Sequence, residues 1–172
     1  MPSTTPPGTV RSPADVPAER RDGDTVEVRT VLDGAGYAEP LVHRVLTAAA
    51  GRSLPRREDG ADELLLVTAG AALLLVDGVT DELTEGTGVL LRAGETWSLD
   101  VPEHLELQSV LVPAPPGPWA TASARDVPPG PRTRRLGSSA LEEATSGREF
   151  EVLFDGRRGS RGATQFVGHI PA

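Results

Sequence analysis

The feature that most constrains the fold is a series of short apolar runs, each ended by a turn signal, between Thr25 and Pro113. The run "TVEVRTVL" alternates apolar and polar residues, as a strand with one buried face does. The runs "ELLLVTAG" and "AALLLVDG" each end at a turn signal, and the Asp77-Gly78 step after the second is typical of a β-hairpin. Helical periodicity is absent from this region. About eight short strands at this spacing predict an all-β sandwich or barrel.

The flanking segments differ in composition. Residues 1–24 are rich in Pro, Ser, Thr and charged side chains. Such a segment buries too little apolar surface to offset the entropy of ordering, so we expect a disordered tail. Residues 114–136 are Pro-rich and are predicted to form a stiff, extended linker. The β-barrel is therefore expected to occupy residues 25–113.

The last part of the chain, residues 137–172, is predicted to contain a short helix and two extra strands. The helix would cover Gly137–Gly147, with a serine N-cap at its start and Gly147 at its end. The strands would lie in "REFEVLFDG" and "GATQFVGHIPA". We expect residues 148–170 to dock on the outer sheet of the barrel, because an isolated pair of strands would leave apolar faces exposed. These faces carry Phe150, Val152, Phe154 and Phe166.

Composition excludes several classes of function. The chain has no cysteine, which excludes disulfides, thiolate metal sites and a cysteine nucleophile. Its net charge of -8 argues against a nucleic-acid partner, because phosphate binding needs a basic face. No apolar run approaches the roughly 20 residues of a membrane span, and the N-terminus lacks the apolar segment of a secretory signal. We therefore expect a cytoplasmic protein without a nucleic-acid or membrane partner.

The spacing of four glycines relative to a few polar and aromatic residues is the most specific signal. Five residues separate Gly51 from Arg57, and six separate Glu63 from Gly70. Five residues separate Gly86 from Arg92, and two separate Gly94 from Trp97. This pattern resembles the two signature motifs of the cupin superfamily, and the likeness covers roughly Val26 to Val112. The resemblance implies a small jelly-roll barrel whose three histidines and one glutamate hold a divalent metal.

The residues at the motif positions are not those of a metal site. The resemblance places Arg57 and Asp59 at the two histidine positions of the first motif, and Trp97 at the histidine position of the second. It places Arg92 and Val101 at the proline and asparagine positions of the second motif, and only Glu63 is retained. Arginine has no lone pair to offer and repels a cation, and the indole N–H of tryptophan only donates. We therefore predict no metal and no other cofactor in this barrel.

Two interpretations of these positions remain. Arg57, Asp59 and Glu63 form either a solvated charged loop or, with Arg92, a polar cluster at the barrel mouth. Such a cluster would bind a small anionic or hydroxylated ligand, with Arg57 as a clamp for a carboxylate. Trp97 either fills the space that a metal and its ligands would take or provides a stacking surface for a ligand.

The C-terminal sequence "REFEVLFDGRRGSRGATQFVGHIPA" resembles the strands that lead into a second cupin domain in two-domain (bicupin) proteins. The resemblance implies that residues 137–172 open an incomplete second domain that ends early. A divalent metal, and the dioxygenase or isomerase chemistry that it supports, would then belong to the absent domain.

Three functions follow as hypotheses, and no catalytic residue is assigned. The first is a metal-free barrel that binds a small molecule or serves as the structural half of a bicupin. The second is a metal-free isomerase or epimerase, in which Asp59 or Glu63 would be the base; Arg57 would lower the pKa of that carboxyl and make it a poor base. Enzymes of this kind usually use a histidine or a tyrosine as the base, and Tyr37 is the only tyrosine, so one of these carboxylates would have to serve. The third is an oligomerisation module, and we expect a homodimer formed through edge strands.

Overall fold

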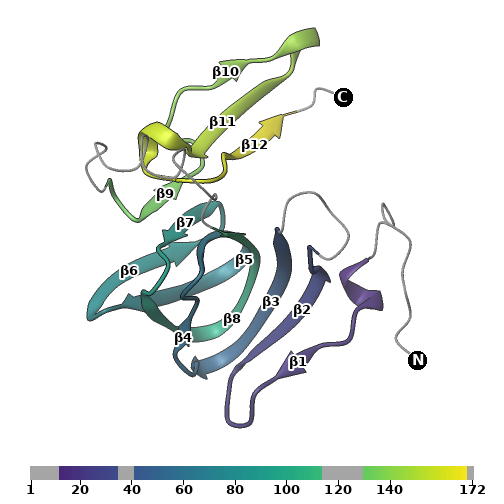
Figure 1. The fold of residues 1–172 in the computed structure, drawn as a ribbon, viewed down its shortest axis with the longest axis vertical. Coiled ribbons are helices and arrows are strands. Elements are labelled where there is room, and N and C mark those ends of the chain that lie inside the picture. Colours follow the sequence, from purple (N-terminus) through teal and green to yellow (C-terminus); the bar gives the residue numbers. More distant parts are fainter. Residues whose placement is uncertain (1–11, 35–40, 114–129, 170–172) are drawn as a thin grey trace.

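The computed structural model describes residues 12–34, 41–113 and 130–169. These residues form two antiparallel sheets, joined by turns and short 3-10 helices (Figure 1). The order in the large sheet is β1-β2-β3-β8-β5-β7-β9, with β4 paired to β8 and β6 paired to β5. Its strands are β1 (Glu19–Arg20), β2 (Val26–Leu32), β3 (Val42–Arg52), β4 (Arg56–Arg57), β5 (Ala61–Val76), β6 (Val79–Thr84), β7 (Thr87–Leu91), β8 (Thr96–Pro113) and β9 (Thr133–Arg135). The predicted all-β class is confirmed.

The large sheet curls around one apolar core. Along β5, Leu65 and Val67 point inward and are 0% and 1% exposed, while Leu64 and Leu66 point to the outer face. Leucine, valine and alanine make up this core, and Trp97 is its only aromatic residue among the described residues. The alternation that the sequence shows therefore corresponds to the inner and outer faces of the barrel.

Two strands are longer than predicted. The runs on either side of Gly70 form one 16-residue strand, β5, and the runs around Pro102 form one 18-residue strand, β8. Each strand absorbs its irregular residue as a shift in register, between Gly70 and Leu73 on β5 and opposite Ala49 and Gly51 on β3. The glycine and the proline bend these strands without ending them. The Asp77-Gly78 hairpin between β5 and β6 is confirmed.

The N-terminal segment is more ordered than predicted. Residues 12–24 include a 3-10 helix, η1 (Pro13–Asp15), and the strand β1, whose Glu19 and Arg20 pair with Val28 and Glu27 of β2. Asp24 is buried there. Composition did not indicate this order, because hydrogen bonds from two arginines to Asp24 and the pairing of β1 with β2 help to hold the segment. Residues 1–11 of the predicted tail lie outside the described residues.

The small sheet has the order β10-β11-β12. Its strands are β10 (Glu142–Glu143), β11 (Glu149–Phe154) and β12 (Gln165–His169), with 3-10 helices η2 (Thr145–Gly147) and η3 (Gly156–Arg158) between them. The two predicted strands are thus present. Leu153 and Phe154 of β11 pack against Leu64, Leu90 and Val112 on the outer face of the barrel, so the expected docking occurs (Figure 1).

The predicted helix over Gly137–Gly147 is wrong. That segment forms a turn, the two residues of β10 and the short helix η2. The reason is the buried carboxylate of Glu151, which accepts the backbone N–H groups of Gly137 at 2.6 Å and Ser139 at 2.8 Å. These N–H groups are held by β11, so the serine-rich start is fixed as a turn. Of the predicted linker, residues 133–135 form β9 on the barrel edge, and residues 114–129 lie outside the described residues. None of the helices in the described part of the chain is long and apolar enough to cross a membrane.

Candidate ligand-binding site

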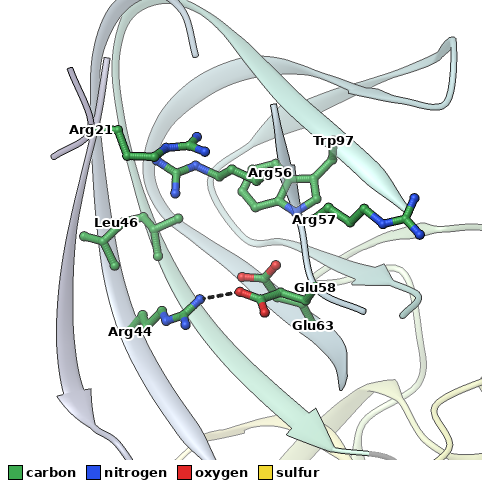
Figure 2. Close-up of a pocket in the computed structure, with 9 residues that line it drawn as sticks. Arg21, Arg44, Leu46, Arg56, Arg57, Glu58, Glu63 and Trp97 are labelled. Carbon is green, nitrogen blue, oxygen red and sulfur yellow. Dashed lines mark hydrogen bonds and ion pairs between the residues drawn. The ribbon is translucent and has the colours of Figure 1, made fainter. Parts of the chain in front are cut away.

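A cavity of about 130 Å³ lies at one end of the barrel, and most of the side chains around it are charged (Figure 2). Four arginines from three segments meet there with two glutamates. The residues that line the cavity are Arg21, Val28, Arg44, Leu46, Arg56, Arg57, Glu58, Glu63 and Trp97. Nothing comparable in charge lies on the inner face further along the barrel, where the described residues are the apolar core.

The pairing of β4 with β8 decides which residues face the cavity. Arg56 is opposite Trp97 and Arg57 is opposite Thr96. Directly opposed residues point to the same face of a sheet, so Arg56 points inward with Trp97 and Arg57 points outward. The guanidinium carbon of Arg56 lies 6.0 Å from the centroid of the Trp97 ring, a cation–π distance.

Asp24 fixes the position of Arg56. Its carboxylate accepts Arg56 Nη2 at 2.7 Å and Arg21 Nη2 at 3.0 Å, and its other oxygen accepts the backbone N–H groups of Val26 and Leu54. Burial opposes ionisation of Asp24, but these hydrogen bonds outweigh it and hold its pKa below the usual 3.8. Burial likewise lowers the pKa of Arg56, against the opposite effect of Asp24, yet a guanidinium remains charged in proteins.

Arg44 and Glu58 form the second ion pair at the cavity. Arg44 lies on β3 on the same face as Leu46, and its Nη1 donates to Glu58 Oε1 at 2.8 Å (Figure 2). Glu58 follows β4 and points inward like Arg56, two residues earlier. The two side chains are 29% and 38% exposed, so this pair is in contact with solvent.

Glu63 is the buried carboxyl group of the cavity. It lies on β5 in line with Leu65 and Val67, and it is 4% exposed. Ser109 of β8 donates its hydroxyl to Glu63 Oε1 at 2.5 Å. Burial raises the pKa of Glu63 above its usual 4.5, although hydrogen bonding by Ser109 and Trp97 and the charge of Arg44 act against the shift. The cavity therefore contains a carboxyl group biased toward its protonated form.

The five predicted site residues lie in three places. Glu63 and Trp97 are inside the barrel, and Trp97 packs in the core at 2% exposure. Arg57 lines the cavity at its rim, where its Nε donates to the exposed Asp59 at 2.6 Å. Arg92 is on the outer face, where its Nη1 donates to Asp62 at 3.1 Å. Arg57, Glu63 and Trp97 thus line one cavity, whereas Asp59 and Arg92 are not among its lining residues. That these residues bind a ligand stays a prediction.

Five residues at the site were not found from the sequence: Arg21, Arg44, Arg56, Glu58 and Ser109. For Arg44 a signal existed, since it alternates in phase with the inward-facing Leu46 and Ala48. For Arg56 and Glu58 the motif spacing pointed to the adjacent residues, because spacing does not determine which face a two-residue strand presents.

The donor set of the cavity does not suit the divalent metal that the fold family implies. The inward-facing residues nearest the motif positions are Arg56, Glu58, Glu63 and Trp97, of which only the two glutamates can act as ligands. Arg44 and Arg56 place positive charge beside them. Within residues 12–34, 41–113 and 130–169, no group of three or more His, Cys, Asp or Glu side chains is placed to hold a metal ion.

The sequence matches no protein-family model and no curated protein, but solved structures share the fold. The predicted oxalate decarboxylase of Thermotoga maritima aligns with a TM-score of 0.53 and 18% identity, over 61% of this chain and 98% of its own. The polyketide cyclase RemF of Streptomyces resistomycificus aligns with a TM-score of 0.51 and 19% identity, over 59% of this chain and 76% of its own.

A protein from Pseudomonas aeruginosa described as glyoxylate-induced gives a TM-score of 0.59 at 15% identity, over 77% of this chain and 50% of its own. The expectation of a two-domain protein stays a prediction. At these identities the likeness concerns architecture. Together with the antiparallel topology and the motif glycines, it identifies the fold of this chain as a cupin-type jelly roll.

Proposed function

We propose that the barrel binds a small anionic or hydroxylated molecule in the cavity, and that it does so without a metal. The observation that carries this proposal is the wall of the cavity, which is lined by four arginines and by the buried carboxyl group of Glu63. Buried charges are costly, so a cavity that gathers them is suited to a ligand with matching polar groups.

The arginines have donor capacity beyond their own ion pairs. A guanidinium carries five N–H donors in a planar fork. Arg44 uses Nη1 on Glu58, and Arg56 uses Nη2 on Asp24. The Nε of Arg56 is buried and has no hydrogen-bond partner among the described residues. Further N–H groups are thus available to an anion, which arginine binds better than any other side chain does.

A titration of the 15N-labelled, EDTA-treated protein with glycolate and with glycerol tests the proposal. The indole N–H of Trp97, read in a Trp119→Phe background, reports on the cavity because Trp97 lines it. We expect a saturable shift with at least one probe. Arg56→Gln should weaken binding by at least about tenfold, the cost of a lost charged hydrogen bond.

The matched control is Arg52→Gln. Arg52 is 69% exposed and pairs with Asp100 outside the cavity, so this variant should bind as the wild type does. Absence of a saturable shift with both probes would contradict the proposal, as would binding that appears only after a divalent metal is restored.

One observation favours a second candidate, a metal-free acid–base enzyme. A carboxyl serving as general acid or base works best when its pKa is moved toward neutrality, and burial moves the pKa of Glu63 in that direction. Arg57 does not oppose it, because it pairs with Asp59. This candidate requires Glu63-dependent exchange of a carbon-bound proton of a bound acid with D2O, and Glu63→Gln should abolish that exchange. Tyr37 lies outside the described residues.

A further inference from the structure

The two glutamates of the cavity differ in how firmly they are held. Glu63 lies within the long strand β5, is 4% exposed and receives the Ser109 hydroxyl at 2.5 Å. Glu58 follows the two-residue strand β4, is 38% exposed in its side chain and, among the described residues, forms an ion pair with Arg44 alone. Figure 2 shows both carboxyl groups at the same part of the cavity, facing Arg44. Glu63 is part of the framework, whereas Glu58 can rotate away.

In the contact between Arg44 and Glu58, the guanidinium of Arg44 already binds a carboxylate, and that carboxylate belongs to the same chain. Its 2.8 Å distance is that of a charge-assisted hydrogen bond. An ion pair that is partly exposed on both sides contributes little, because solvent screens both charges. A free carboxylate that reaches Arg44 therefore has only a weak competitor to displace.

We propose that Glu58 is a tethered competitor for the ligand, and that the ligand is a small monocarboxylate with an oxygen substituent next to its acid group. The inference rests on the proposed binding function. The carboxylate of the ligand replaces that of Glu58 on Arg44. Its neighbouring oxygen then lies beside Glu63 and forms a hydrogen bond with that carboxyl group, while Ser109 donates its hydroxyl to Glu63.

Glu58→Gln tests this inference, with Asp59→Asn as the matched control. Both changes remove one negative charge from the same loop, but Asp59 is 76% exposed and points outward to Arg57. Loss of the competitor should strengthen glycolate binding by about two- to fivefold, the range expected for an exposed ion pair. Asp59→Asn should change it by less than twofold. Binding is measured on the Trp97 indole N–H.

Glycolamide separates charge recognition from simple access to the cavity. It has the shape of glycolate without the anionic group, so Glu58→Gln should leave its affinity unchanged. Arg44→Gln should remove the preference for glycolate over glycolamide; Arg44→Lys, which keeps the charge, should restore part of it if the first variant folds poorly.

The outcomes distinguish the inference from the function on which it rests. If neither acid nor polyol binds to the wild type or to Glu58→Gln, the binding function itself is wrong. If glycolate binds to the wild type and Glu58→Gln leaves its affinity unchanged or weaker, the cavity binds ligands but Glu58 is not a competitor. An equal gain in glycolate affinity in Asp59→Asn and Glu58→Gln would also overturn the inference, because it would show a general effect of removing one negative charge.

Discussion

Glu63 carries a carboxyl group in surroundings built for a neutral side chain, and its pH dependence follows from that placement. Because burial raises its pKa in the folded protein above 4.5, the folded state binds the proton more tightly than the unfolded state. The stability that this group contributes is complete below pH 4.5 and is lost as the pH rises through the folded pKa.

Glu63→Gln removes this titration while keeping an oxygen that can accept the Ser109 hydroxyl. We therefore expect the free energy of unfolding of the variant, relative to the wild type, to increase between pH 4.5 and 8. Urea unfolding at several pH values measures it. Asp24 and Asp62 have lowered pKa values, so their contributions to stability change with pH in the opposite direction, below pH 3.8. Both residues are present in the wild type and in the variant, so their contributions cancel when the two unfolding free energies are subtracted. Parallel curves for the two proteins would contradict the assignment.

Gly70 is the motif glycine with the strictest steric requirement. Its φ is +82°, and a Cβ there would lie 2.9 Å from the carbonyl carbon of His104 and closer still to its oxygen. Gly78 has a similar φ of +87° but open space around it. Gly78→Ala should therefore cost about 1–2 kcal/mol for the left-handed backbone alone. Gly70→Ala should cost about 2–5 kcal/mol because overpacking adds to it. Urea unfolding compares the two, and equal costs would show that β8 yields to the added methyl group.

Spacing predicted the backbone of the site better than its side chains. The four motif glycines, Gly51, Gly70, Gly86 and Gly94, all have positive φ, as their places in turns and bends require. Beside the first motif, the cavity is lined by Arg56 and Glu58 as well as by the predicted Arg57, and Asp59 is not among its lining residues. Which side chains of β4 face the cavity depends on how β4 pairs with β8. That register is set by contacts between strands, so the sequence of one strand does not determine it. The same holds for Asp24 and Arg21, whose role depends on contacts 30 or more residues away.

At the scale of elements, Asp62 connects β5 to the segment before β12. It accepts Arg161 through both carboxylate oxygens, Arg92 Nη1 at 3.1 Å and the backbone N–H of Ala93 at 3.0 Å. Burial works against its ionised form, but these donors prevail and hold its pKa below 3.8. The stability that it contributes is therefore present above pH 3.8 and is lost as the pH falls through the folded pKa.

Asp62→Asn should destabilise the protein by about 1–2 kcal/mol, discounted for the partial exposure of both arginines. It should also speed amide hydrogen exchange in β12 more than in β5. Asp59→Asn, at an exposed pair, should change stability by less than about 0.5 kcal/mol. Uniformly fast exchange across 148–169 in the wild type would contradict docking of the small sheet altogether.

The elements that sequence predicted least well are those whose conformation is imposed by a neighbour. Gly137–Gly147 has serine, glutamate and glycine where a helix would have them, yet Glu151 on β11 captures the backbone N–H groups. The strands β1, β4 and β9 have two or three residues each, too few for a period-two pattern. β5 and β8, by contrast, were evident from their apolar alternation, and only the effect of Gly70 and Pro102 within them was misjudged.

At the scale of the whole molecule, the two sheets share apolar residues across their contact. Leu153 and Phe154 are both 0% exposed, and they cover Leu64, Leu90 and Val112 on the outer face of the barrel. The Nε2 of Gln165 adds a hydrogen bond to the backbone oxygen of Leu65 at 3.1 Å. This contact removes apolar surface of both sheets from water, so we expect them to unfold in one transition.

Phe154→Ala tests this coupling, because it removes a buried side chain of the small sheet and should cost about 3–5 kcal/mol. In a Trp119→Phe background, the fluorescence of Trp97 reports on the barrel core alone. If the sheets form one cooperative unit, the unfolding free energy obtained from the fluorescence of Trp97 falls by the full cost of the substitution, and the urea midpoint falls with it. Phe166→Ala is the matched control, since Phe166 is 59% exposed and has an edge-to-face contact with Phe150, and it should cost about 1 kcal/mol or less. An unchanged Trp97 midpoint in Phe154→Ala, with fast amide exchange in β11, would instead show that the barrel folds independently and that the small sheet is an attachment.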